Sequence, residues 1–163
     1  MSKRIEAILK SYPEMVQKRN CLAYQIAHFK GLSAEEVIES MYTPRQDGER
    51  VQTSTISDKT AQIAMVYQER RERMNREWYE YLEQQLRLVN DEVAFLEAAI
   101  KALPPKISEV MCDLVFEQNT WDAVQAKRHI GRATLSAYRR KAIQFLDTLY
   151  ADRTELEGAF LLQ

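Results

Sequence analysis

The chain has 163 residues, of which 45% are hydrophobic and 29% are charged, and its formal net charge at pH 7 is −1. This composition is ordinary for a folded protein and excludes disorder along the whole chain. Four glycines and four prolines leave few turns, and Glu, Gln, Arg, Ala and Leu are abundant. We therefore expect an all-α protein.

The cysteines and the lengths of the apolar runs give further expectations about metal sites and location. Cys21 and Cys112 lie far apart, and neither has a second Cys or a His at metal-ligand spacing, so we expect reduced cysteines and no metal. No apolar run approaches the roughly 20 residues that cross a bilayer, and the first residues lack the apolar stretch of a signal peptide. We expect no membrane partner and a cytoplasmic location.

Residues 1–42 are predicted to form N-terminal helices. Apolar residues recur at helical spacing as far as about Lys30, and the pattern stays in phase across Pro13. This predicts one kinked helix or two helices, with Ser11 capping the restart and Gly31 stopping the segment.

A second, shorter helix and a loop follow. Ser33 and Glu36 form a capping-box pattern, which predicts a helix start. Residues 43–56 are rich in Thr, Ser and Gln and contain Pro44 and Gly48, so we expect a linker or long loop there.

Residues 57–103 are predicted to form one long amphipathic helix, which with the N-terminal helices gives a helical hairpin or rod. One apolar stripe runs along its second half at a mean spacing near that of an α-helix: Met74, Trp78, Leu82, Leu86, Val89, Val93, Leu96, Ile100 and Leu103. The stripe indicates packing of helix on helix, and a homodimer interface is a second role that it allows.

Residues 104–150 are predicted to form a separate three-helix unit. Pro104 and Pro105 mark its start, and Asn119 or Thr120 can cap its second helix. The last helix follows a turn at residues 129–131 and buries its apolar residues on one side. Three short amphipathic helices in this order are typical of a helix-turn-helix.

Basic residues are concentrated in the second half of this unit. Between Ala123 and Leu146 there is no Asp or Glu, whereas the basic residues are Lys127, Arg128, Arg132, Arg139, Arg140 and Lys141. The positive field is therefore local, although the net charge of the whole chain is slightly negative.

Projection of the last helix at 100° per residue gathers one outward face with small residues between arginines, a pattern that lets a helix enter a major groove. We predict that base edges are read by Arg132, Ala133, Ser136, Ala137 and Arg140. We predict that DNA phosphates are held by Thr120, Lys127, Arg128, His129, Arg139 and Lys141.

These residues carry a family resemblance. The run from Leu103 to Leu149, including Thr120-Trp121-Asp122 and the segment 134–142, resembles the region-4 helix-turn-helix of σ70-type factors, and more closely the RinA/ArpU type of small phage transcriptional regulators. Residues 51–61 and the charged helix after them are similar to the segment that such regulators carry upstream.

The resemblance implies a function and its partners. It implies an activator of late genes in a phage or prophage, acting in the cytoplasm of a bacterial host without a cofactor. The partners it implies are double-stranded promoter DNA and bacterial RNA polymerase.

Three positions depart from the family's pattern. Gln125 stands where a small residue is usual, Arg128 takes a position that is more often apolar, and His129 replaces the usual turn glycine. His tolerates the left-handed conformation better than most residues, so we expect a strained turn rather than a lost motif.

Other functions are less well supported by the residues. No phosphate-binding loop, nucleophile elbow or Cys/His cluster is present, so we expect no catalysis. A helical assembly or adaptor protein, such as a phage small terminase subunit, is the alternative left open.

Residues 151–163 are predicted to be a C-terminal tail. Its apolar residues are Leu156, Phe160, Leu161 and Leu162. We expect them to pack back onto the protein, with docking of a partner as the alternative.

Overall fold

The computed structural model describes residues 3–33, 36–37 and 56–162, with side chains from residue 65 onward in the last range. Every regular element in these ranges is a helix, without a strand among them, which confirms the all-α class. Contacts divide the chain into two units, Met1–Asn20 with Arg87–Gln163, and Cys21–Leu86. Within the described ranges, no helix has the length and apolar character that a bilayer crossing requires.

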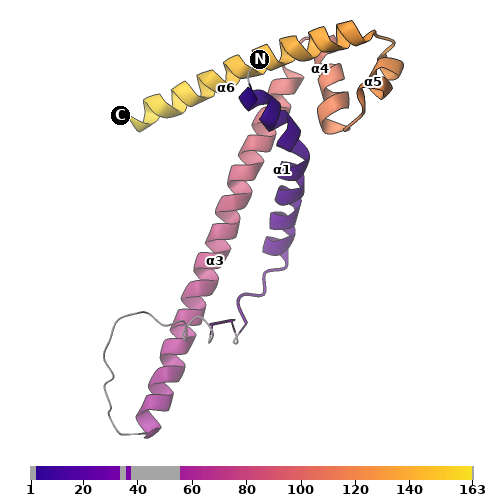
Figure 1. The fold of residues 1–163 in the computed structure, drawn as a ribbon. Coiled ribbons are helices and arrows are strands. Elements are labelled where there is room, and N and C mark those ends of the chain that lie inside the picture. The colour runs from indigo at the N-terminus through magenta and orange to yellow at the C-terminus, as the bar shows by residue number, and fades with distance from the viewer. Residues whose placement is uncertain (1–2, 34–35, 38–55, 163) are drawn as a thin grey trace. The chain divides into compact units, whose positions relative to one another are not determined.

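Helix α1 spans Lys3–Ala27 as one continuous helix with Pro13 inside it (Figure 1). Of the two predicted alternatives, the structure selects a single helix, and Ser11 caps no restart, because its hydroxyl donates to the carbonyl oxygen of Ile8 at 3.0 Å. Ile5 and Leu9 are buried on the same stripe as Tyr12. This shared packing holds the segment helical although Pro13 removes one backbone hydrogen bond.

The predicted capping box is present. The Ser33 N–H donates to the Glu36 carboxylate at 2.8 Å, and the Glu36 N–H donates to Ser33 Oγ at 3.2 Å. Two backbone donors at a helix start are thereby satisfied. The linker predicted at residues 43–56 lies outside the described residues, apart from Ile56.

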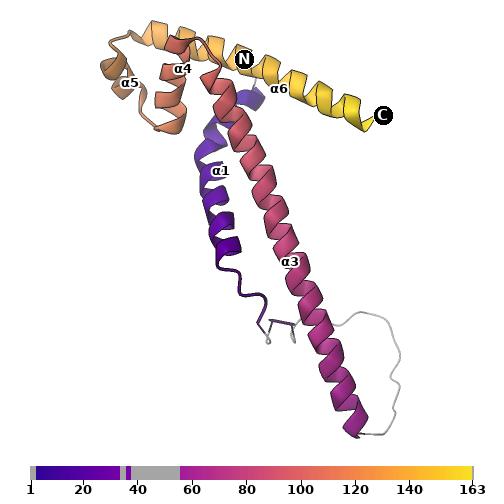
Figure 2. The same cartoon turned by 180° about the vertical axis from the view of Figure 1, so that it is seen from behind.

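Helix α3 spans Ile56–Lys101, close to the predicted range. In the first unit its C-terminal part lies beside the N-terminal part of α1 (Figure 2). The buried core there takes residues from several helices: Ile5, Leu9, Tyr12, Val93, Leu96, Ala99, Ile100, Leu103, Ile107, Met111, Val115, Ala142, Ile143, Leu146 and Tyr150. This part of the predicted stripe is therefore internal core.

The predicted three-helix unit contains four helical segments. Helix α4 (Pro105–Met111) passes into a π-helical turn, η1 (Cys112–Phe116), and helices α5 (Trp121–Arg128) and α6 (Arg132–Leu161) follow. Pro105 lies in the first turn of α4, as predicted. In both views α4 and α5 lie along the N-terminal part of α6 (Figures 1 and 2).

The C-terminal tail is a continuation of α6. Arg153 ties this part of the helix to Glu92, with Nη1 2.9 Å from Oε2. The apolar side chains beyond it have exposed fractions of 73–90%: Leu156, Phe160, Leu161 and Leu162. The expectation that they pack back is wrong, since a straight helix carries them away from the core.

Candidate nucleic-acid interface

A small hydrophobic core fixes α5 against α6. Val110, Val124 and Leu135 are buried together, one each from α4, α5 and α6. Trp121 and Tyr138 pack partly buried against them. Each helix contributes its apolar stripe to this core, so the opposite side of α6 is left to solvent.

The turn between α5 and α6 has the conformation that the sequence predicted. His129 is left-handed, with φ 52° and ψ 43°, and its N–H donates to the carbonyl oxygen of Gln125. Gly131 is extended and precedes the first residue of α6, and its carbonyl oxygen accepts from the Leu135 N–H at 3.0 Å. A residue other than glycine therefore makes the chain reversal, which carries a conformational cost.

Asp113 is the only buried charged residue in the described part of the chain, with an exposed fraction of 1%. Lys127 Nζ lies 2.7 Å from its Oδ1, and Arg128 Nε lies 2.6 Å from its Oδ2. Glu117 also accepts from Lys127, and Glu109 accepts from Arg128. This acid cluster, Glu109, Asp113 and Glu117, thus binds both cations at the end of α5.

The contacts between the acid cluster and the two cations shift the pKa values of Asp113 and Lys127. The hydrogen bond from Arg128 holds the pKa of Asp113 below its ordinary value, and the bond from Lys127 adds to this, although burial acts in the opposite direction. The same contacts raise the pKa of Lys127, because Asp113 and Glu117 stabilise the ammonium form. Asp113 and Lys127 are therefore both charged at neutral pH.

These contacts revise two of the predicted phosphate ligands. Lys127 and Arg128 are each paired with two carboxylates, so neither carries an uncompensated charge. These contacts hold α5 against α4 and η1, so Lys127 and Arg128 stabilise the packing of the helices beside α6. Arg128 thus forms an ion pair with the buried carboxylate of Asp113.

The predicted base-reading face lies on the open side of α6. Arg132, Ala133, Ala137 and Arg140 are exposed, and Ser136 is half-buried. The Arg132 guanidinium lies over the Trp121 ring, 5.9 Å from its centroid, so one end of this face is ordered by an aromatic contact. Among the described residues, no carboxylate pairs with Arg132 or Arg140.

The remaining predicted phosphate ligands are placed differently from one another. Lys141 is exposed and unpaired within the described chain, and His129 is exposed in the turn. Arg139 Nη1 donates to Glu6 Oε1 of α1 at 3.2 Å. Thr120 caps α5, its Oγ1 accepting from the Ala123 N–H at 3.3 Å. Of these four residues, Lys141 and His129 therefore face solvent without a side-chain partner among the described residues.

Asp113 is the residue that sequence reasoning missed. It follows Val110 and Met111 in an apolar run, where a single acid gives no local signal of its role. The signal lies in its partners, which are 14 and 15 residues further on. The pairing of Asp113 with Lys127 and Arg128 is formed only when α5 packs against η1, so the local sequence does not predict it.

The described residues hold no group of His, Cys, Asp and Glu arranged to bind a metal ion. Comparisons with models of protein families, with curated proteins and with solved structures find no match to this chain.

Proposed function

We propose that this chain is a sequence-specific DNA-binding transcription regulator that places the N-terminal part of α6 in the major groove of double-stranded DNA. Arg132 and Arg140 bond base edges on this proposal, with Ala133, Ser136 and Ala137 allowing close approach. Lys141 and His129 contact phosphates and set the orientation of the helix.

One observation carries the proposal, and it is the distribution of uncompensated charge. In the unit formed by α4, η1, α5 and α6, Lys127, Arg128 and Arg139 are bound by carboxylates. Arg132, Arg140 and Lys141 are exposed on α6 without an acidic partner in the described residues. Unpaired Lys and Arg side chains attract the anionic DNA backbone. The small side chains beside them let the DNA groove approach the helix closely.

The resemblance given above supplies the biological setting of the proposal. A regulator of the RinA/ArpU type acts on late promoters of a phage or prophage, and we propose the same class of promoter for this chain. Contact with RNA polymerase belongs to the same proposal.

Binding of the purified chain to fragments of its own genomic neighbourhood tests the function. We expect selective enrichment of a few fragments by the wild type, and loss of this selectivity in the Arg132→Ala/Arg140→Ala variant. The comparison is made at two salt concentrations, because phosphate contacts weaken steeply with salt whereas base contacts set the choice of fragment.

A charge-matched control separates a reading face from general basicity. Lys18→Ala/Arg87→Ala also removes two positive charges, one from α1 and one from α3, and we expect it to retain selective binding. Equal losses in both variants, or binding by the wild type without selectivity, would contradict a sequence-reading role.

A further inference from the structure

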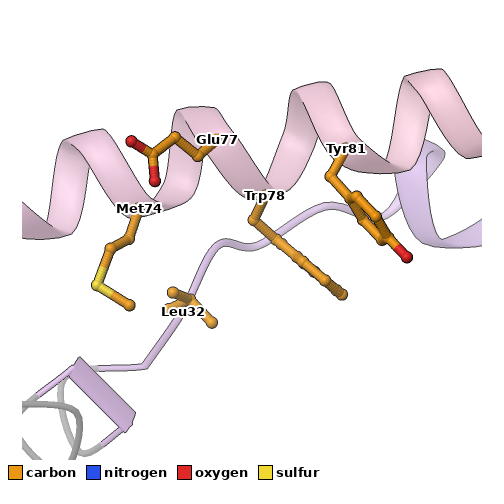
Figure 3. Close-up of a pocket in the computed structure, with 5 residues that line it drawn as sticks. All are labelled: Leu32, Met74, Glu77, Trp78 and Tyr81. Atoms are coloured by element: carbon orange, nitrogen blue, oxygen red, sulfur yellow. The ribbon is translucent and has the colours of Figure 1, made fainter.

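The second unit exposes an aromatic surface on α3 that the proposed DNA contacts do not use. Trp78 and Tyr81 have exposed fractions of 42% and 50%, and their rings stack with centroids 5.7 Å apart at an interplanar angle of 16°. Figure 3 shows Met74, Trp78 and Tyr81 projecting from the same side of the helix, with Leu32 beside them. We define these four residues as the α3 apolar patch.

The patch is the uncovered end of the stripe predicted from the sequence. Leu82 is 2% exposed, whereas Trp78, one turn before it, is 42% exposed. Helix α3 has 46 residues and α1 has 25, so α1 is too short to cover the whole length of α3. Trp and Tyr are enriched among the residues that contribute most to binding at the centres of protein interfaces.

The charges on either side of the patch indicate what covers it. Residues 69–76 hold four arginines and two glutamates, a net charge of +2, whereas residues 77–86 hold three glutamates and no Lys or Arg, a net charge of −3. Helices pack about 8–10 Å apart, a distance comparable with the roughly 8 Å screening length at physiological salt, so charges on facing helices still interact. A second α3 running antiparallel sets each basic segment against an acidic one, and a parallel one sets like charges together.

We propose that the α3 apolar patch binds a second copy of this chain, with the two α3 helices crossing antiparallel at Trp78. The two Trp78 side chains then meet at the crossing, and Met74 of each copy packs on the second copy's Tyr81, so the interface is self-complementary, as two-fold symmetry requires. This inference does not depend on the proposed DNA binding, and its test is made without DNA.

Sedimentation equilibrium of the full chain tests the association. We expect the wild type to reach twice its mass of 19.1 kDa, and Trp78→Ala/Tyr81→Ala to weaken association at least about tenfold. Leu156→Ala/Phe160→Ala is the matched control, since it removes two apolar side chains of α6 that are more exposed than Trp78 and Tyr81, and we expect it to associate as the wild type does. Circular dichroism confirms that each variant keeps its helices.

Charge reversal tests the complementarity. Glu77→Lys/Glu80→Lys/Glu83→Lys makes both segments basic, and Arg71→Glu/Arg73→Glu/Arg76→Glu makes both acidic. We expect each variant alone to be monomeric and an equimolar mixture to form heterodimers, because every facing pair of segments then has opposite charge. Failure of the mixture to associate overturns the charge argument.

Cysteine cross-linking tests the orientation. Arg71 lies seven residues before Trp78 and Gln85 lies seven after it, so the two positions face each other across the antiparallel crossing. In a Cys21→Ser/Cys112→Ala background, we expect Arg71→Cys and Gln85→Cys chains to form a disulfide when mixed and neither to do so alone. A disulfide between two Arg71→Cys chains overturns the antiparallel crossing, and a monomer at all concentrations overturns the interface.

Discussion

Arg128 Nε donates to Asp113 Oδ2 at 2.6 Å, across 15 residues of chain, and this contact joins the end of α5 to the π-helical turn η1. The second guanidinium contact, from Nη2 to Asp113 Oδ1 at 3.2 Å, makes the pair bidentate. Bidentate pairs fix direction as well as distance. The packing of α5 against α4 and η1 therefore rests partly on one buried ion pair.

Removing the charge of Asp113 tests this role. Asp113→Asn leaves Lys127 and Arg128 without their shared carboxylate, and we expect the free energy of unfolding to fall by about 3 kcal/mol. Urea denaturation followed by circular dichroism measures it. Glu109→Gln is the control, because the Glu109 side chain is 57% exposed, and we expect a loss below about 1 kcal/mol. Similar losses in the two variants would contradict a special role for the buried acid.

The same ion pairs predict that the free energy of unfolding depends on pH in the acid range. The pKa of Asp113 is lowered in the folded protein from an ordinary value of 3.8, so folding favours its ionised form. The resulting stability is present above about pH 4 and is lost as the pH falls below 3.8 toward the lowered pKa. We expect the wild type to lose more stability than Asp113→Asn between neutral pH and pH 3. Parallel curves of unfolding free energy against pH would rule this out.

Arg140 and Lys141 are adjacent and exposed, yet they should act differently on DNA. Arg140→Ala should weaken binding to the selected site by about 1–3 kcal/mol and have little effect on random sequence. Lys141→Ala should weaken binding to all sequences and lower the salt slope by about 1. Fluorescence anisotropy with both DNA types, over a range of salt, measures the two effects. If Arg140→Ala weakens both DNA types equally, Arg140 belongs with the phosphate contacts.

His129 offers a test of strain in the turn. Its φ of 52° lies in the left-handed region, which glycine adopts without steric cost. His129→Gly should therefore stabilise the fold by about 0.5–1 kcal/mol, after allowing for the greater freedom of glycine in the unfolded chain. Gln118→Gly, at φ 55°, provides a second position of the same kind. Thermal unfolding of both variants measures the change, and a loss of stability in His129→Gly would show that its side chain contributes more than its backbone costs.

The sequence determined the helical class and several helix starts, because these depend on neighbouring residues. Apolar spacing located α3, and Ser33 with Glu36 formed the expected cap. Thr120 was one of two predicted caps for α5, and the structure selects it. The exposed face of α6 also followed from periodicity alone, since a helix with one buried stripe leaves its other side to solvent.

The tertiary structure decided which cations of the unit are free. Lys127, Arg128 and Arg139 resemble Arg140 and Lys141 in the sequence, but their partners come from η1, α4 and α1, and Glu6 is 133 residues from Arg139. Packing likewise kept Pro13 inside one helix and left Trp78 uncovered. Charge compensation depends on distances between segments that the chain brings together only on folding, and local sequence carries no record of them.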